Sequence, residues 1–216
     1  MSLSKKFQQW QFPKLRLEMF SDAVFAIVVT LLVLELKVPH IKNALDMEEV
    51  KHELLHKLPI FYSWVISFFF VTIMWLHHHN IMNMITHADY GAVWINTFLL
   101  FFICLLPFPT ALMGEYPEQP LFVMFWGITV SLTSCMLVWF YHYTTKHYLS
   151  DNFDKATVRK NVRLSAFAAP VIYMVGASMA YVDTTISFVV YALVPLLYIT
   201  PLDKPKKHNL KSEMEH

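Results

Sequence analysis

Long apolar runs separated by short polar connections fill most of the 216-residue chain. A hydrocarbon core about 30 Å thick is crossed by a helix of about 20 apolar residues. Six runs are long enough, and they cover residues 17–38, 58–83, 90–113, 119–147, 161–182 and 184–202. The pattern predicts an all-α membrane protein with six transmembrane helices in a single domain, residues 1–202, followed by a basic cytoplasmic tail, residues 203–216.

Prolines interrupt the third and the sixth of these runs. Pro107 and Pro109 lie inside the third run, and Pro195 lies inside the short sixth run. Proline lacks a backbone N–H and its ring clashes with the preceding turn, so it kinks or breaks a helix. We expect a break near residue 107, which a membrane tolerates only where other protein groups bond the freed carbonyls.

The distribution of Lys and Arg predicts the orientation. With six spans and the N-terminus inside, four of the 17 Lys and Arg residues are external: Lys37, Lys42, Lys51 and Lys57. The other 13 lie on the cytoplasmic side, as the positive-inside rule requires. The predicted location is the cell (plasma) membrane, with both termini cytoplasmic.

The connection between the first two spans contains a second pattern. Leu45, Val50, Leu54 and Leu58 recur at helical spacing, with acidic residues between them. This spacing is typical of a short amphipathic helix, and we expect this helix to lie over the outer mouth of the protein. A flexible polar loop is the alternative.

Three residues of the first span, Ile27, Thr30 and Leu34, form a narrow stripe along one face of the helix. At about 100° per residue, Thr30 and Leu34 fall roughly 60° and 20° from Ile27, whereas Asp22 falls roughly 140° away. If several copies assemble, this stripe would present an apolar pore surface with a single hydroxyl, while the acid points into the protein. Spacing alone also allows Ile27 and Leu34 to be buried helix contacts.

Ionisable residues at membrane depth are costly, so they indicate a function or a buried pair. The candidates are Arg16, Asp22 and the run His77, His78, His79. We expect the Arg16 guanidinium to be paired by a residue of another helix, possible partners including these histidines. Consecutive helical residues point about 100° apart, so the three histidines cannot bind one metal ion, and a polar cluster that orders helix packing is the better interpretation.

Composition excludes several classes of protein. The chain is 56% hydrophobic and 15% charged, with a net charge of +1, which gives no electrostatic basis for binding nucleic acid. It has four glycines and neither a GxSxG nor a phosphate-binding motif, so we predict no enzyme, no cofactor and no metal site. Cys104 and Cys135 are expected to be small core residues. No internal repeat is evident, which argues against a secondary transporter.

The stretch RLEMFSDAVFAIVVTLLVLELKVP, residues 16–39, resembles the signature of the transmembrane protein 175 family of potassium channels. Matching residues in the first span are Arg16, Phe20, Ser21, Asp22, Phe25, Ala26, Ile27, Thr30, Leu31, Leu32 and Pro39. Those in the next two spans are Ser67, Phe68, Trp75, His77, His78, Trp94, Asn96, Leu106, Pro107, Phe108 and Pro109. The similarity covers spans one to three well, and spans four to six by little more than hydropathy.

The resemblance implies a cation channel without a re-entrant filter loop, in which the first helices line the pore. The Ile27 equivalent forms the narrowest ring, the Thr30 and Leu34 equivalents form further layers, and the threonine contributes to the preference for K⁺. Polar residues of the first three helices form a network that holds the pore helices. Carried over to this chain, that network comprises Arg16, Phe20, Ser21, Asp22, Trp75, His77 and Asn96.

The single FSD tripeptide implies the one-repeat bacterial type, which is a homotetramer in the lipid bilayer. The expected permeant ions are K⁺ and other monovalent cations, with weaker selectivity than in the two-repeat animal members. A proton-conducting channel and a secondary transporter are the alternative functions.

Overall fold

The computed structural model describes residues 12–43, 45–153 and 168–198, and the elements in this part of the chain are helical. Their bounds are α2 (Lys14–Leu32), the 3₁₀ helix η1 (Val33–Glu35), α3 (Met47–His56), α4 (Leu58–Met84), α5 (Tyr90–Leu105), α6 (Pro107–Glu115), α7 (Pro120–Tyr148), α9 (Ala168–Met179) and α10 (Thr184–Tyr198). The all-helical fold predicted from the apolar runs is confirmed.

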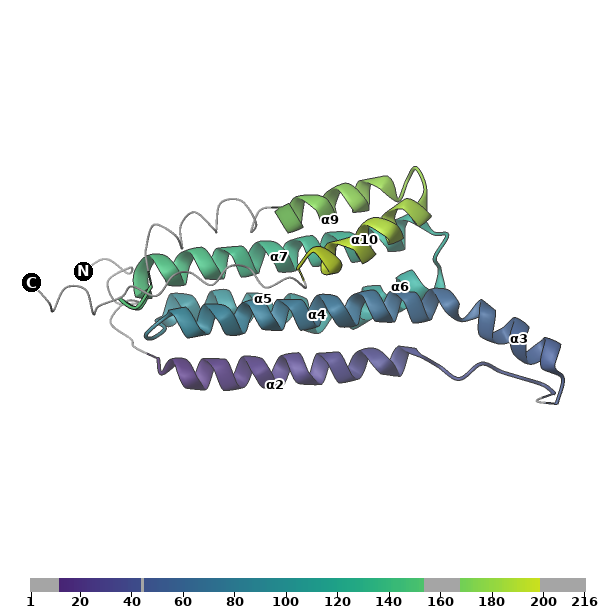
Figure 1. Ribbon diagram of the computed structural model, residues 1–216, viewed down its shortest axis with the longest axis horizontal. Helices are drawn as coiled ribbons and strands as arrows, with labels where there is room; N and C mark the ends of the chain where they lie inside the picture. Colours follow the sequence, from purple (N-terminus) through teal and green to yellow (C-terminus); the bar gives the residue numbers. More distant parts are fainter. Residues whose placement is uncertain (1–11, 44, 154–167, 199–216) are drawn as a thin grey trace, which may run out of the picture.

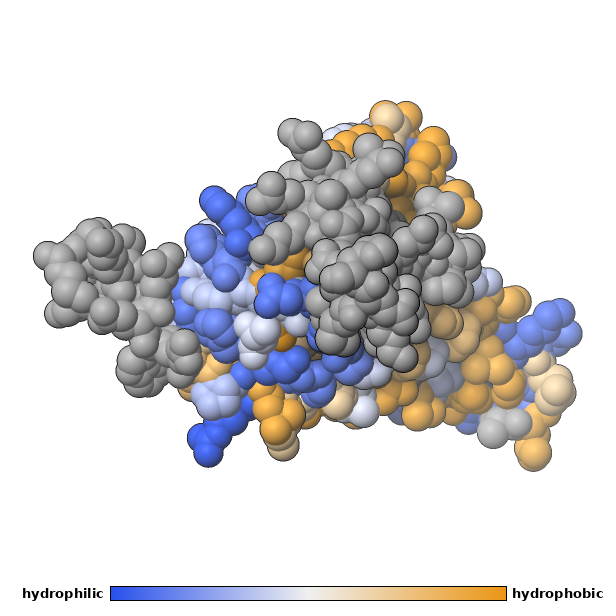
Figure 2. All heavy atoms as spheres, turned by 60° about the vertical axis from the view of Figure 1, so that its left-hand side comes forward, coloured by the Kyte–Doolittle hydropathy of each residue, from blue (hydrophilic) through white to orange (hydrophobic). Residues whose placement is uncertain are grey.

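The long helices lie side by side in one elongated bundle (Figure 1). α2 packs on α4, α5 and α6; α9 packs on α7 and α10, and α10 packs on α4 as well as on α7. Figure 2 brings forward the end where α2 begins and shows hydrophilic residues gathered there, with apolar residues further along the bundle. This distribution suits a bundle whose middle lies in hydrocarbon.

Four stretches are long and apolar enough to cross a membrane, namely Lys14–Glu35, Leu58–Met84, Tyr90–Glu115 and Pro120–Tyr148. They agree with the first four predicted spans to within a few residues. α9 and α10 are shorter apolar helices, and parts of the predicted spans 161–182 and 184–202 lie outside the described residues. The six-span count therefore stays a prediction, and the predicted tail, 203–216, also lies outside the described residues.

The predicted interruption of the third span is confirmed. α5 ends at Leu105 and α6 begins at Pro107. The amide of Leu106 bonds the carbonyl of Ile103 at 3.2 Å, and the Thr110 hydroxyl donates to the Leu106 carbonyl at 2.8 Å. Protein groups thus bond carbonyls at the break, as membrane depth demands.

The helix between the first two spans is also confirmed. α3 begins after Asp46, whose carboxylate accepts from the backbone amides of Glu48 and Glu49. An aspartate at this position satisfies N–H groups that have no partner inside the helix. Figure 1 shows α3 projecting beyond the other helices as a bent continuation of α4. Its predicted position over an outer mouth stays a prediction.

The start of α2 is tied to the turn between α4 and α5. The backbones of Phe12 and Ala88 exchange two hydrogen bonds, 2.7 and 3.3 Å long. The Lys14 ammonium donates to the carbonyls of Met82 and Ile85 at 3.2 and 3.1 Å, which satisfies carbonyls at the end of α4. One end of α2 is therefore held at a defined position against its own subunit.

Both cysteines contradict the expectation of core positions. Cys104 on α5 and Cys135 on α7 are exposed. In a membrane the outward faces of these helices meet lipid, where a small apolar thiol is as acceptable as in the core.

Where α7, α9 and α10 meet, the backbones approach closely at Gly127. A Cβ atom added there would lie 2.8 Å from Cζ of Tyr191 and 2.9 Å from Cβ of Ala177. Tyr191 is fully buried, and its hydroxyl donates to the Val123 carbonyl at 3.1 Å, so the ring has little freedom to move.

We therefore expect Gly127→Ala to destabilise the bundle by about 1 to 3 kcal/mol, the usual cost of overpacking a tight contact. Thermal unfolding in detergent followed by tryptophan fluorescence would measure the loss. Leu132→Ala, at an exposed position of α7, is the control and should have a small effect. Equal stability of the Gly127→Ala protein and the wild type would show that the three helices do not pack this closely.

Candidate functional site: the outward face of α2 and its supporting contacts

α2 has two different faces. Its buried residues are Leu17, Ser21, Phe25, Val28 and Leu32, which recur every three or four positions. The opposite face makes no comparable contact with the described part of the subunit. There Ile27 is 57% exposed and Leu34 is 67% exposed, and Thr30 lies between them. The predicted stripe is thus brought together on a face that the described part of the subunit leaves uncovered.

This face differs from the other exposed surfaces of the bundle. Exposed positions on α4 and α5 carry bulky aromatic rings, such as Phe69 and Phe101. The outward face of α2 has one aromatic ring, Phe20, and otherwise aliphatic residues together with the small Ala23 and Ala26 and the polar Thr30. Small residues allow helices to approach closely in a membrane, so this face suits contact with other helices better than contact with lipid.

The Thr30 hydroxyl has a defined orientation. Its oxygen lies 2.8 Å from the Ile27 carbonyl and 3.1 Å from the Ala26 carbonyl, so its hydrogen is donated to the helix backbone. A hydroxyl has one donor and two acceptor positions. The remaining lone pairs of Thr30 are exposed on the same face as Ile27.

Asp22 is directed away from this face and towards α4. The indole N–H of Trp75 donates to the Asp22 carboxylate at 2.9 Å. Hydrogen bonds to an ionised group are shorter and stronger than neutral ones. This contact joins two predicted network residues and fixes the rotation of α2 relative to α4.

A second, fully buried chain of hydrogen bonds joins α2 to α5 and α4. Ser21 donates to the Leu17 carbonyl at 2.8 Å and accepts from the Asn96 amide at 2.9 Å. The carbonyl oxygen of Asn96 lies 2.9 Å from Nε2 of His78. Because the amide oxygen can only accept, this bonding pattern assigns the Nε2–H form to His78. The three side chains act as one directed connection through the core.

His78 is held from both sides by aromatic rings. Its imidazole stacks on Phe140 of α7 at 5.5 Å with a 10° interplanar angle, and its centroid lies 5.6 Å from Phe25 of α2. Through His78 the network reaches α7 as well as α2, α4 and α5. The neighbouring His79 forms a contact of 3.3 Å with Glu18 of α2.

The structure places three other predicted network residues differently. Phe20 is exposed on the outward face of α2, and the Arg16 side chain has neither a hydrogen bond nor an ion pair with any described residue. His77 is half-buried, and its neighbour His78 makes the bond to Asn96. The roles predicted for Phe20, Arg16 and His77 stay predictions.

One feature of the sequence favours His78 over His77 as the partner of Asn96. Ser67 lies 11 residues before it, which is three helical turns, so both point in nearly the same direction. Ser67 is also buried and bonds Thr110 and the indole of Trp126 at 2.8 and 2.9 Å. A polar stripe through Ser67 and His78 marks the inward face of α4.

Asn96→Leu is expected to lower the free energy of unfolding by about 1 to 3 kcal/mol, because it leaves the Nε2–H of the buried His78 without an acceptor. Chemical denaturation in mild detergent would measure this change. Asn96→Asp is the matched variant, since it keeps an acceptor oxygen and should lose less. An Asn96→Leu protein as stable as the wild type would mean that the buried chain contributes no net stability.

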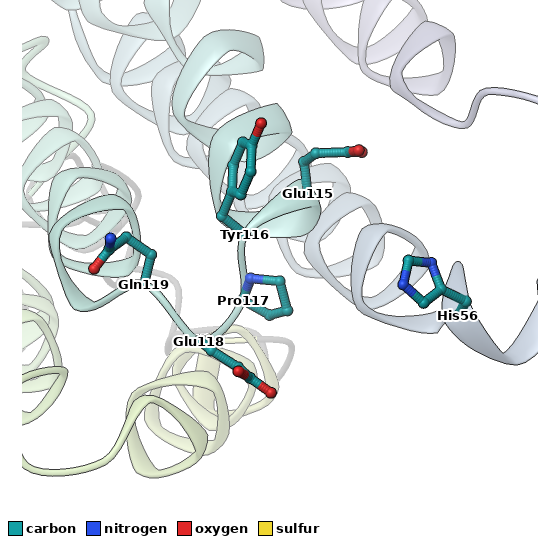
Figure 3. A pocket seen from close by; sticks show the side chains of 6 residues that line it. All are labelled: His56, Glu115, Tyr116, Pro117, Glu118 and Gln119. Atoms are coloured by element: carbon teal, nitrogen blue, oxygen red, sulfur yellow. The ribbon is translucent and has the colours of Figure 1, made fainter.

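A hollow at the other end of the bundle has different properties. It measures about 460 Å³ and is lined by His56, Glu115, Tyr116, Pro117, Glu118 and Gln119. Figure 3 shows the side chains of Glu115 and Glu118 well apart, above and below Pro117, so their carboxylates do not meet. Without convergent polar groups this hollow is a weaker candidate than the face of α2.

Comparisons with known proteins identify the family of the chain. The family model described as endosomal/lysosomal potassium channel TMEM175 matches residues 16–107. A potassium channel of Chamaesiphon minutus is 30% identical over 177 residues, which are 80% of this chain and 86% of that protein. A potassium channel of Streptomyces collinus is 27% identical over 85% of this chain and 90% of that protein.

A solved structure and an animal protein extend the comparison. The crystal structure of a lysosomal potassium-selective channel TMEM175 homolog from Chamaesiphon minutus matches with a TM-score of 0.75 and 26% identity, over 86% of this chain and 96% of that one. The endosomal/lysosomal proton channel TMEM175 of Bos taurus is 33% identical over 112 residues, which are 50% of this chain and 23% of that protein.

The long apolar helices and the structural match define a multi-pass α-helical membrane protein of the ion-channel class. The chain belongs to the TMEM175 family, as its signature stretch predicts, and it corresponds to the bacterial type. This family consists of ion channels and is not a class of enzymes.

Proposed function

We propose that this chain is the subunit of a homotetrameric, potassium-permeable cation channel whose α2 helices surround a central axis. Ile27 forms the narrowest ring, and Thr30 and Leu34 form adjoining layers. The observation that supports this most strongly is the division of α2 into two faces. The polar residues Ser21 and Asp22 bond the subunit's own helices, while the described residues leave the stripe through Ile27 uncovered.

The stripe is suited to a pore that opens and closes by wetting. Four isoleucine side chains offer no oxygen ligands. An ion therefore crosses the ring either by losing part of its hydration shell or after the ring has widened. K⁺ loses water at a lower cost than Na⁺ because it is larger and holds its water more weakly. The exposed lone pairs of Thr30 offer partial replacement, which favours cations over anions and K⁺ over Na⁺.

In this proposal the buried network holds the pore helix at a fixed rotation. The Asp22–Trp75 bond and the Ser21–Asn96–His78 chain lie on the side of α2 away from the axis. A rotation of α2 large enough to move Ile27 from the axis would break both. The network therefore limits gating to movements that keep these contacts, such as a small splay.

The proposed channel lies in the plasma membrane with both termini in the cytoplasm, in agreement with the excess of Lys and Arg on that side. We propose that conduction needs no cofactor and no resident metal. Proton conduction is a second candidate function, because the bovine relative is named a proton channel. A secondary transporter is the remaining alternative.

Purified protein in planar bilayers tests the proposal. The expected result is unitary current steps with a reversal potential that follows the K⁺ gradient. A carrier would move K⁺ without resolvable steps, and a proton channel would shift the reversal potential with the pH gradient. The absence of K⁺ current from a protein shown to be folded and tetrameric would contradict the proposal.

A further inference from the structure

Asp89 is a fully buried acidic residue that lies outside the network described above. It forms no ion pair with any described residue. Its carboxylate instead accepts from the backbone amide of Ala92 at 2.8 Å and from the Tyr143 hydroxyl at 2.7 Å, and the Tyr148 hydroxyl lies close to it. A buried charge is tolerated where such donors replace water, and the N-terminal end of α5 favours a negative one. Asp89 therefore joins the start of α5 to the last turns of α7.

The chain that leads to Asp89 is paired on two sides. We call residues 85–89 the α4–α5 turn. On one side, Ala88 exchanges two backbone hydrogen bonds with Phe12, just before α2 begins. On the other side, the Thr86 amide donates to the Tyr148 carbonyl at 3.0 Å, at the end of α7. The α4–α5 turn is thus the segment through which the start of α2 is attached to α7.

The bond between Asp89 and α7 fixes the position of this turn. Asp89 follows Ala88 directly, so the carboxylate that bonds α7 and the backbone that bonds Phe12 belong to adjacent residues. At the other end of the turn, the Ile85 carbonyl accepts from the Lys14 ammonium at 3.1 Å. A shift of the turn relative to α7 therefore moves the first residues of α2 with it.

A small shift at the start of α2 becomes larger along the helix. Ile27 lies 13 residues after Lys14, about 20 Å along the axis, so a change of tilt of about 3° moves Ile27 by about 1 Å. The bonds of Ser21 and Asp22 to α5 and α4 set the rotation of α2 and leave a tilt of this size possible. An apolar ring conducts only when it is wide enough to hold water, so this displacement changes how long the ring stays wet.

We propose that Asp89 is a positioning residue for α2, which sets the tilt of the helix by holding the α4–α5 turn against α7. This inference rests on the proposed channel with its ring of Ile27 side chains. Asp89 contacts neither the ion path nor Ile27, so it acts on the time that the ring spends open. Loosening its bond widens the range of tilts and raises the open probability, whereas the current through an open ring stays the same.

Planar-bilayer recordings of two mild variants test the inference. Tyr143→Phe removes the hydroxyl that holds Asp89, and Asp89→Asn keeps an oxygen acceptor for the Ala92 amide, so that α5 stays capped. Each should raise the open probability several-fold at wild-type unitary conductance and reversal potential. The two effects should not add, because either change breaks the same bond. The matched control is Tyr181→Phe, an exposed tyrosine between α9 and α10, which should behave like the wild type.

The other outcomes separate the role of Asp89 from the proposed channel. An unchanged or lowered open probability in tetrameric variants that conduct K⁺ would overturn the inference and leave the channel standing. Fewer active channels at wild-type open probability, together with a lower unfolding temperature, would show a contribution to stability alone and also overturn it. A changed unitary conductance would place the effect in the ion path, with the same consequence. No K⁺ current from the tetrameric wild type would contradict the proposed function itself.

Discussion

Ile27→Asn is expected to raise the single-channel K⁺ conductance about tenfold, the change that follows from lowering the barrier by about 1.4 kcal/mol. An amide at the narrowest ring can bond water or an ion where isoleucine cannot, and hydrogen bonds to charged groups are worth about 1.5 to 3 kcal/mol. The same substitution should lower the preference for K⁺ over Na⁺, because less dehydration is required.

Bilayer recordings under K⁺ and Na⁺ gradients would measure both effects. The control is Ile186→Asn, which makes the same change at an exposed position of α10. It should leave conductance and selectivity unchanged. If Ile27→Asn and variants with larger and smaller side chains at this position all conduct like the wild type, Ile27 does not line the ion path.

Asp22→Ala is expected to reduce the yield of tetramer and to destabilise the subunit by about 1 to 3 kcal/mol, because the Trp75 indole loses a charged acceptor. The bond of 2.9 Å lies on the side of α2 that packs against α4. Asp22 therefore supports the position of the pore helix, and its removal should change the number of active channels more than the current of each one.

Trp75→Phe removes the other partner of the same bond. In a double-mutant cycle the effects of Asp22→Ala and Trp75→Phe should not add, since either change alone breaks the contact. Noise analysis would separate channel number from unitary current. If Asp22→Ala instead lowers the unitary current, and high salt reduces this effect, Asp22 faces the ion path and the assigned orientation of α2 is wrong.

The sequence predicted those helices and breaks whose position depends on one continuous run of residues. Length and hydropathy located the first four spans, and the lack of an N–H at Pro107 located the break between α5 and α6. The spacing of Val50, Leu54 and Leu58 predicted α3. Each of these features depends on local chemistry, so no knowledge of the neighbouring helices was needed.

The contacts between helices were harder to predict because the apolar residues of α4 are spread around the whole helix. The spacing of Ser67 and His78 was the signal that favoured His78 over His77 as the partner of Asn96, whereas the exact rotation of α4 is set by packing against α2, α6, α7 and α10. Phe20 was grouped with Ser21 and Asp22 because they form one motif. Consecutive helical residues point about 100° apart, however, and Phe20 lies outward.

The most direct test of the central claim is a cryo-electron microscopy reconstruction of the assembled protein in lipid nanodiscs. The expected result is four α2 helices around one axis, with the Ile27 side chains nearest to it and the Asp22–Trp75 bond on the far side of each helix. An assembly with α2 against lipid, or with its axis lined by another helix, would contradict the account.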